Sequence, residues 1–143
     1  MKRFTFTLEP VLALRAEAER KAMERLAVEL VQQAALTADA DRASVRLSNA
    51  HADPADATGV DLVARQAFLE RLELEAATAQ AVAHAQEAQV ATQQAYVEET
   101  ARDREALDRL KTERRLEHGR AVTRAEQAEL LDLVTTRTGR EAA

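Results

Sequence analysis

The chain has no cysteine and no tryptophan, and its 143 residues include only three glycines, two prolines, three phenylalanines and one tyrosine. The absence of cysteine excludes a disulfide framework, a thiolate metal site and a cysteine nucleophile, and it fits a reducing compartment. The scarcity of aromatic residues leaves too little bulk for the core of an ordinary spherical domain. With few glycines and prolines, helices can run on without a break. We therefore expect an all-α protein built from long helices.

Long hydrophobic runs are also absent. The charge-poor stretch 76–95 consists largely of Ala, Gln and Thr, so we expect no transmembrane segment. Glu9 and Pro10 interrupt the apolar residues near the start, which argues against a secretory signal. The net charge of −5 argues against bulk binding of nucleic acid, so no nucleic-acid partner is expected.

The residues that usually carry catalysis do not form a recognisable set. None of His51, His84 and His118 follows a glutamate by three residues, as the ligand pairs of di-iron helical bundles do. The chain also lacks a phosphate-binding glycine loop, a Gly-x-Ser-x-Gly elbow and a His-Glu-x-x-His motif. We expect no enzymatic activity, no catalytic residue, no cofactor and no metal site.

Apolar residues recur with a helical period on both sides of one break. In the second half they repeat every seven residues, with companions three residues on, which predicts a left-handed coiled coil; these residues are Leu62, Leu69, Ala76, Ala83, Val90 and Val97, with Leu72, Ala79 and Leu107. In the first half the steps are mostly three or four, through Leu8, Val11, Leu12, Met23, Ala27, Leu30, Ala34, Ala38 and Val45.

The break is the segment 51–59, which holds one proline and one glycine. It predicts a helix over 8–50, a turn over 51–60 and a helix over 61–137, folded as one domain over 1–143. The fold class is all-α: a long antiparallel two-helix coiled-coil hairpin with an extended C-terminal helix. With the turn centred near residue 55, we expect a monomer in which Leu12 faces Tyr96 or Val97, Leu30 faces Ala79 or Ala83, and Ala34 faces Ala76. The predicted seam is Leu12, Met23, Leu30, Ala34, Ala76, Ala83, Val90 and Val97.

The second helix is the longer one, so its pairing should end near residue 103. Beyond that point we expect the helix to project unpaired, or to kink near Gly119 and fold back. The projecting part has eight basic residues between Arg102 and Arg124 and five acidic ones between Asp103 and Glu117, a surplus of three positive charges. A solvated helix face with i,i+4 pairs and a partner-binding surface both remain open as explanations.

At the opening of the chain, Thr7 is expected to cap the first helix, with Phe6 and Val11 forming a hydrophobic staple. A bare hairpin cannot fully bury Phe4, Phe6 and Leu8. Either they cover the terminal end of the hairpin or they contact a partner, and we favour the partner.

Two segments resemble the flagellar export protein FliJ family, the coiled-coil stalk of the type III export apparatus. They are Phe4-Thr-Phe6-Thr-Leu8-Glu-Pro-Val-Leu-Ala-Leu-Arg15, and Leu107-Asp-Arg-Leu110-Lys111-Thr-Glu-Arg114-Arg115 followed by Arg124-Ala-Glu126-Gln-Ala-Glu-Leu130-Leu-Asp132. The resemblance implies a fold similar to the stalk of rotary ATPases. It also implies three partners: a hexameric flagellar export ATPase, the cytoplasmic domain of the export gate membrane protein, and export chaperones that the protein helps to recycle.

The same resemblance implies a cytoplasmic location, peripheral to the inner face of the cell membrane at the flagellar base, and a part in motility. We take as partner-binding residues Phe4, Phe6, Leu8, Arg15, Leu107, Arg109, Leu110, Lys111, Arg114, Arg115, Glu126, Leu130 and Leu133. Two other hypotheses stay open. One is a generic coiled-coil scaffold or adaptor, and the other is a nucleic-acid-associated factor that uses the arginines between residues 102 and 124.

Overall fold

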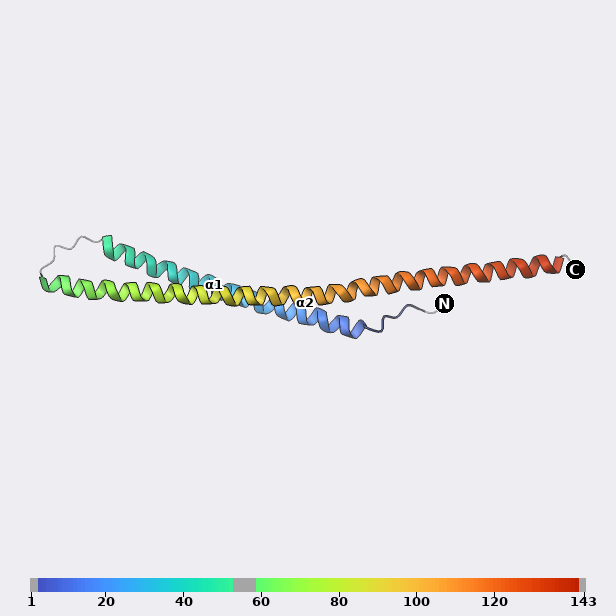
Figure 1. The fold of residues 1–143 in the computed structure, drawn as a ribbon, viewed down its shortest axis with the longest axis horizontal. Helices are drawn as coiled ribbons and strands as arrows, with labels where there is room; N and C mark the ends of the chain where they lie inside the picture. The colour runs from blue at the N-terminus through green and yellow to red at the C-terminus, as the bar shows by residue number, and fades with distance from the viewer. Residues whose placement is uncertain (1–2, 53–58, 142–143) are drawn as a thin grey trace. The chain divides into compact units, whose positions relative to one another are not determined.

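The computed structural model describes residues 3–52 and 59–141, with side chains as far as residue 136. Two α-helices make up nearly all of these residues: α1 is Glu9–Ala52 and α2 is Gly59–Glu141, with no strand in the described ranges (Figure 1). Both helices extend two residues further towards each other along the chain than the sequence pattern predicts. The remaining connecting residues, 53–58 with Pro54, lie outside the described residues. The expected all-α hairpin of two helices is confirmed.

Contacts divide the chain into two units, which we describe separately. The middle unit is Glu19–Glu99, and the terminal unit combines Met1–Ala18 with Thr100–Ala143.

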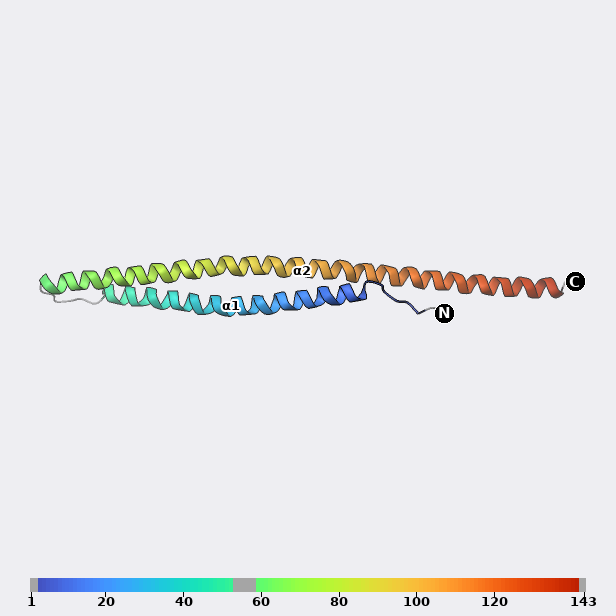
Figure 2. The same cartoon turned by 90° about the horizontal axis from the view of Figure 1, so that it is seen from below.

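In the middle unit the two helices are antiparallel and share a heptad register. The Gln93 amide donates to the carbonyl oxygen of Ala22 at 3.1 Å, and the Gln86 amide donates to that of Glu29 at 3.3 Å. A step of seven residues forward along α1 is thus matched by a step of seven back along α2. The Arg65 guanidinium, which donates to the Ala50 carbonyl at 3.2 Å, continues the same register. Figures 1 and 2 both show these parts of α1 and α2 side by side.

The heptad predicted for α2 forms the seam. Leu72, Ala76, Ala83 and Val90 are buried, while Ala79 and Val97 are half-buried. Leu62 is exposed, because α2 begins before the paired part of the middle unit is reached. The period of seven along α2 was therefore predicted correctly, except at its first member.

The face predicted for α1 is displaced by one residue from Met23 to Ala34, whereas Leu12 is buried as predicted. Met23 is 49% exposed and Leu30 43% exposed, and Ala34 is exposed as well. The side chains that turn inward instead also repeat with steps of three and four; they are Glu19, Ala22, Leu26, Glu29, Gln33, Leu36, Ala40, Ala43, Leu47 and Ala50. The sequence pattern favoured the more apolar of two adjacent stripes, whereas pairing with Gln86 and Gln93 brings the stripe with polar members into the seam.

The register also differs from the expected one. Leu30 was predicted to face Ala79 or Ala83, but its neighbour Glu29 is bonded to Gln86. The physical reason lies at the turn end, where Arg65 reaches the last turn of α1. The residues of α2 before Arg65 extend past the end of α1, so the pairing of the two helices is not centred on residue 55 (Figure 1).

The core is small because alanine dominates it. The buried apolar residues among those described are Leu12, Ala22, Ala40, Ala43, Leu72, Ala76, Ala83 and Val90, of which five are alanine. Alanine lets the two helix backbones approach closely, but each one removes little apolar surface from water, at about 25 cal/mol per Å². Much of the stability must therefore come from many weak contacts spread along the seam.

In the terminal unit, α1 begins one residue later than Thr7 as N-cap would require. The Leu12 amide donates to the Leu8 carbonyl at 2.9 Å, which makes Leu8 the N-cap, and a turn precedes it in which the Glu9 amide donates to the Phe6 carbonyl at 3.1 Å. The predicted staple is wrong for the same reason, since the shifted cap moves position N4 from Val11 to Leu12. Leu12 is buried and Val11 is exposed.

Pairing in the terminal unit continues beyond residue 103, which corrects the predicted limit. The Lys111 ammonium contacts the Glu9 carboxylate at 2.7 Å, and the ring of His118 lies against that of Phe4. The extra length comes from the register and from residues 3–8, which continue along α2 past the start of α1. α2 also runs without interruption through Gly119, so the alternative of a fold-back at that glycine is wrong. One helical glycine costs about 1 kcal/mol, less than breaking the helix on both sides of it.

Candidate partner-binding surface

The N-terminal segment lies against α2 in the terminal unit. The ring centroids of Phe4 and His118 are 5.6 Å apart with the planes tilted by 45°. A groove of about 670 Å³ lies here, and it is lined by residues 3–8 together with Leu110, Arg114, Glu117, His118 and Ala121. Phe4 and Phe6 are half-buried, whereas Leu8 stays exposed. The two phenylalanines thus cover part of α2 and still offer apolar surface beside arginine and glutamate side chains.

Two ion pairs hold the start of α1 to α2. Arg15 Nη1 lies 2.9 Å from Asp103 Oδ2, and Lys111 Nζ lies 2.8 and 2.7 Å from the two carboxylate oxygens of Glu9. Glu9 is the first residue of α1, where the helix dipole also favours a negative charge. Both pairs are partly exposed, and such pairs stabilise by about 0.2–1 kcal/mol. Arg15 and Lys111 therefore have a structural role within the chain.

The other residues predicted between 107 and 115 divide into two groups. Leu107 and Leu110 are half-buried in the paired region, so they are not the unpartnered leucines that the sequence suggested. Arg109 and Arg114 are exposed. Arg109 donates to the carbonyl of Glu105 at 3.4 Å, and Arg114 contacts Glu117 at 3.1 Å. The two arginines keep their charge at the surface.

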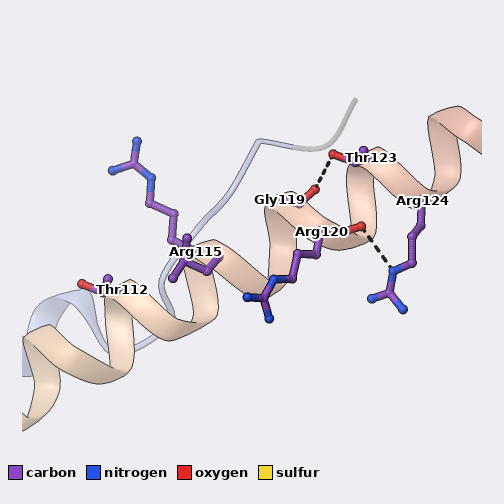
Figure 3. Close-up of a pocket in the computed structure, with 7 residues that line it drawn as sticks. Thr112, Arg115, Gly119, Arg120, Thr123 and Arg124 are labelled. Carbon is purple, nitrogen blue, oxygen red and sulfur yellow. Dashed lines mark hydrogen bonds between the residues drawn. The ribbon is translucent and has the colours of Figure 1, made fainter.

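A second groove, of about 900 Å³, lies on α2 around Gly119 (Figure 3). Its lining residues are Thr112, Arg115, Leu116, Gly119, Arg120, Thr123 and Arg124. Figure 3 shows the Arg115 side chain extending to one side of the helix, and those of Arg120 and Arg124 to the other. The lining includes three cations and no carboxylate. Only Arg115 of this group was singled out from the sequence as a partner-binding residue.

Exposed leucines follow further along α2. Leu130 is 62% exposed and Leu133 66% exposed, with Leu131 and Val134 also exposed beside them. Glu126 is half-buried. These apolar side chains are the part of the predicted overhang that the described chain leaves exposed, which makes them candidates for contact with a partner.

The exposed apolar stripe on α1 with Met23 and Leu30 was not predicted as a surface, because the sequence pattern placed these residues in the seam. The heptad of α2 contained the signal that would have placed it correctly. Gln86 and Gln93 occupy seam positions, and polar seam residues call for polar partners such as Glu29 on the facing helix.

The surface is suited to recognition by charge and apolar contact. Within residues 3–52 and 59–136, no three His, Asp or Glu side chains lie close enough together to hold a metal ion. Over its described length, neither helix has a stretch both long and apolar enough to cross a membrane.

The fold is a helical hairpin of two long helices that pack against each other, and the terminal unit has exposed apolar and basic side chains. Comparison of the chain with protein-family models, with curated proteins and with solved structures found no match.

Proposed function

We propose that the protein is a coiled-coil stalk component of the flagellar type III protein export apparatus. In this role it binds the hexameric export ATPase and the cytoplasmic domain of the export gate, and it helps to recycle export chaperones. It works on the cytoplasmic side, at the inner face of the membrane where the flagellum is built. The observation that carries the proposal is the segment Phe4 to Arg15, which resembles the opening of the FliJ family. The chain that begins with this segment folds as a helical hairpin, as the resemblance implies.

The terminal unit supplies surface chemistry that agrees with this role. Arg109, Arg114 and Arg115 add exposed positive charge to this unit, and Leu130 and Leu133 add exposed apolar surface. Several weak charge contacts and a small apolar contact can hold a helix inside a ring of subunits while still letting it move, because no single contact is strong.

The proposal is tested by binding. The purified full-length chain should associate with the flagellar export ATPase encoded in the same genome, and Leu130→Ser with Leu133→Ser should weaken that association. A matched control is Leu74→Ser, which changes an equally exposed leucine in the middle unit. Equal loss in both variants, or no association at all, would contradict the proposal.

A generic coiled-coil adaptor is the second candidate, and one observation favours it. Met23 and Leu30 lie on an exposed apolar stripe of α1 in the middle unit, which a further helix could cover. An adaptor would form a stable stoichiometric complex through this stripe without any ATPase. Substitution of Met23 and Leu30 by Ser would then abolish the complex and leave ATPase binding unaffected.

A further inference from the structure

The groove around Gly119 has the residue spacing of a coiled-coil hole. Leu116, Gly119, Arg120 and Thr123 stand at positions i, i+3, i+4 and i+7 of α2, and all four line the groove. Four residues at this spacing form the hole that receives one side chain of a facing helix. Heptad counting from Ala83 and Val90 places Leu116 on the side of α2 opposite the seam with α1. The hole is therefore open to a helix other than α1.

Nothing within the described chain accounts for glycine at this position. A Cβ atom built on Gly119 meets nothing within 4 Å, so alanine would fit without any change. Alanine would also favour the helix by about 1 kcal/mol. What glycine adds is space on the outer face, which lets another backbone or a large side chain approach closely.

The heptad spacing of the hole continues along the same face, with Thr123 and Glu126 between the leucines. Leu116, Thr123 and Leu130 are spaced by seven residues, and so are Gly119, Glu126 and Leu133 three positions later. Leu116, Leu130 and Leu133 are exposed. This second heptad row runs past the groove, and it is long enough to face several turns of a partner helix.

Charge indicates which helix would fit. Arg115 stands on one edge of the groove, and Arg120 and Arg124 stand on the other (Figure 3). In a coiled coil the residues that flank the apolar seam pair with opposite charges on the partner. A helix with acidic residues on both edges is complementary to this face, and one with basic residues is repelled.

We propose that the α2 face centred on Gly119 binds an amphipathic helix of another protein in coiled-coil packing, with an apolar side chain in the hole and acidic residues along both edges. A nucleic acid fits less well, since no aromatic side chain lines the groove for base stacking. A second copy of the chain also fits less well, because its exposed α1 stripe has Arg20 and Arg25 on its borders. The proposal does not depend on the export-apparatus assignment.

The test uses the full-length chain and two designed peptides of about four heptads with leucine at positions a and d. One peptide has glutamate at positions e and g, and the other has lysine there. We expect the glutamate peptide to bind and the lysine peptide to bind at least about tenfold more weakly at low salt. Equal affinity for the two peptides would overturn the proposal.

Substitutions in the groove locate the contact. The triple variant Arg115→Glu, Arg120→Glu, Arg124→Glu should weaken binding of the glutamate peptide about tenfold and strengthen that of the lysine peptide. The matched control Arg20→Glu, Arg25→Glu, Arg42→Glu makes the same charge change on α1 and should alter affinity by less than about twofold. Gly119→Ala keeps the helix, and it should weaken binding of the glutamate peptide about threefold because the added methyl group fills part of the hole.

A photoreactive residue in place of Leu116 should crosslink to the glutamate peptide, and one in place of Leu74 should not. The reverse pattern would overturn the proposal, as would unchanged affinity in both the triple variant and Gly119→Ala. Binding of single-stranded RNA that the triple variant abolishes, without binding of the glutamate peptide, would assign the groove to nucleic acid. A concentration-dependent dimer in sedimentation that Gly119→Ala weakens would assign it to a second copy.

Discussion

The side-chain amide of Gln86 donates to both the carboxylate and the carbonyl oxygen of Glu29, at 2.6 and 3.3 Å, within the seam of the middle unit. Gln86 is buried, so its amide needs a protein partner in place of water. An apolar seam can slide by a heptad at little cost, whereas this pair can form in one register only. Gln86 and Glu29 therefore help to fix how α1 and α2 align.

The first prediction concerns this pair. Gln86→Ala leaves the half-buried Glu29 carboxylate without its donor, and the free energy of unfolding should fall by about 1–3 kcal/mol. Replacing both residues by leucine removes the polar pair altogether and should be neutral or stabilising. Urea denaturation followed by circular dichroism measures both changes. A double variant less stable than Gln86→Ala would show that the pair is not what limits stability here.

The second prediction compares a residue in the seam of α2 with a residue on the exposed stripe of α1. Ala76 is buried in the seam, so Ala76→Leu should push the helices apart and cost about 1–3 kcal/mol. Ala34, on the exposed stripe of α1, should accept leucine with a change within about 0.5 kcal/mol. Thermal unfolding of the two variants gives the comparison. Equal losses would mean that both stripes are packed in solution.

Sequence periodicity was sufficient for α2 but not for α1. Ala76, Ala83 and Val90 are spaced by seven residues, with Leu72 four residues before Ala76, so the sequence of this one helix indicates its seam. On α1, the stripe with Met23 is more apolar than the stripe with Glu29, and hydrophobicity alone selects the wrong one. The choice between them depends on which residues of α2 they meet, which is a property of the pair of helices.

Exposure within the candidate surface was predicted correctly for some of its residues and wrongly for others. Leu130 and Leu133 were predicted to lie beyond the paired region, and both are exposed, as are Arg109, Arg114 and Arg115. Leu107 and Leu110 were wrongly predicted to be unpaired, because their partial burial depends on a pairing that continues beyond residue 103. The Gly119 groove needed the structure, since a lone glycine within a helix equally suggests a kink.

The third prediction concerns the N-terminal segment. The variant Phe4→Ser with Phe6→Ser loses the ring contact with His118 and the apolar lining of the groove beside it. Residues 3–8 should then exchange amide hydrogens faster and be cleaved sooner by proteases, while the middle unit keeps its melting temperature. Unchanged protection of the segment would show that backbone contacts hold it, and loss of protection throughout the chain would show a wider structural role.

The fourth prediction concerns the exposed arginines. Charge reversal at Arg114 and Arg115 should lower the association rate with the export ATPase and reduce the dependence of that rate on salt. Charges at the rim of an interface steer the encounter, and salt screens them beyond about 8 Å at physiological ionic strength. Stopped-flow measurements at several salt concentrations test this. A change confined to the dissociation rate would place these arginines in the centre of the contact.

The most direct test of the account is the rate of ATP hydrolysis by the hexameric flagellar export ATPase of the same genome, measured with increasing amounts of the full-length chain. We expect a saturable rise in the hydrolysis rate, because a stalk that binds the ring alters how its subunits act together. The rise should be lost with Leu130→Ser, Leu133→Ser and retained with Leu74→Ser. A hydrolysis rate that stays constant at all concentrations, with no complex detected by sedimentation, would contradict the account.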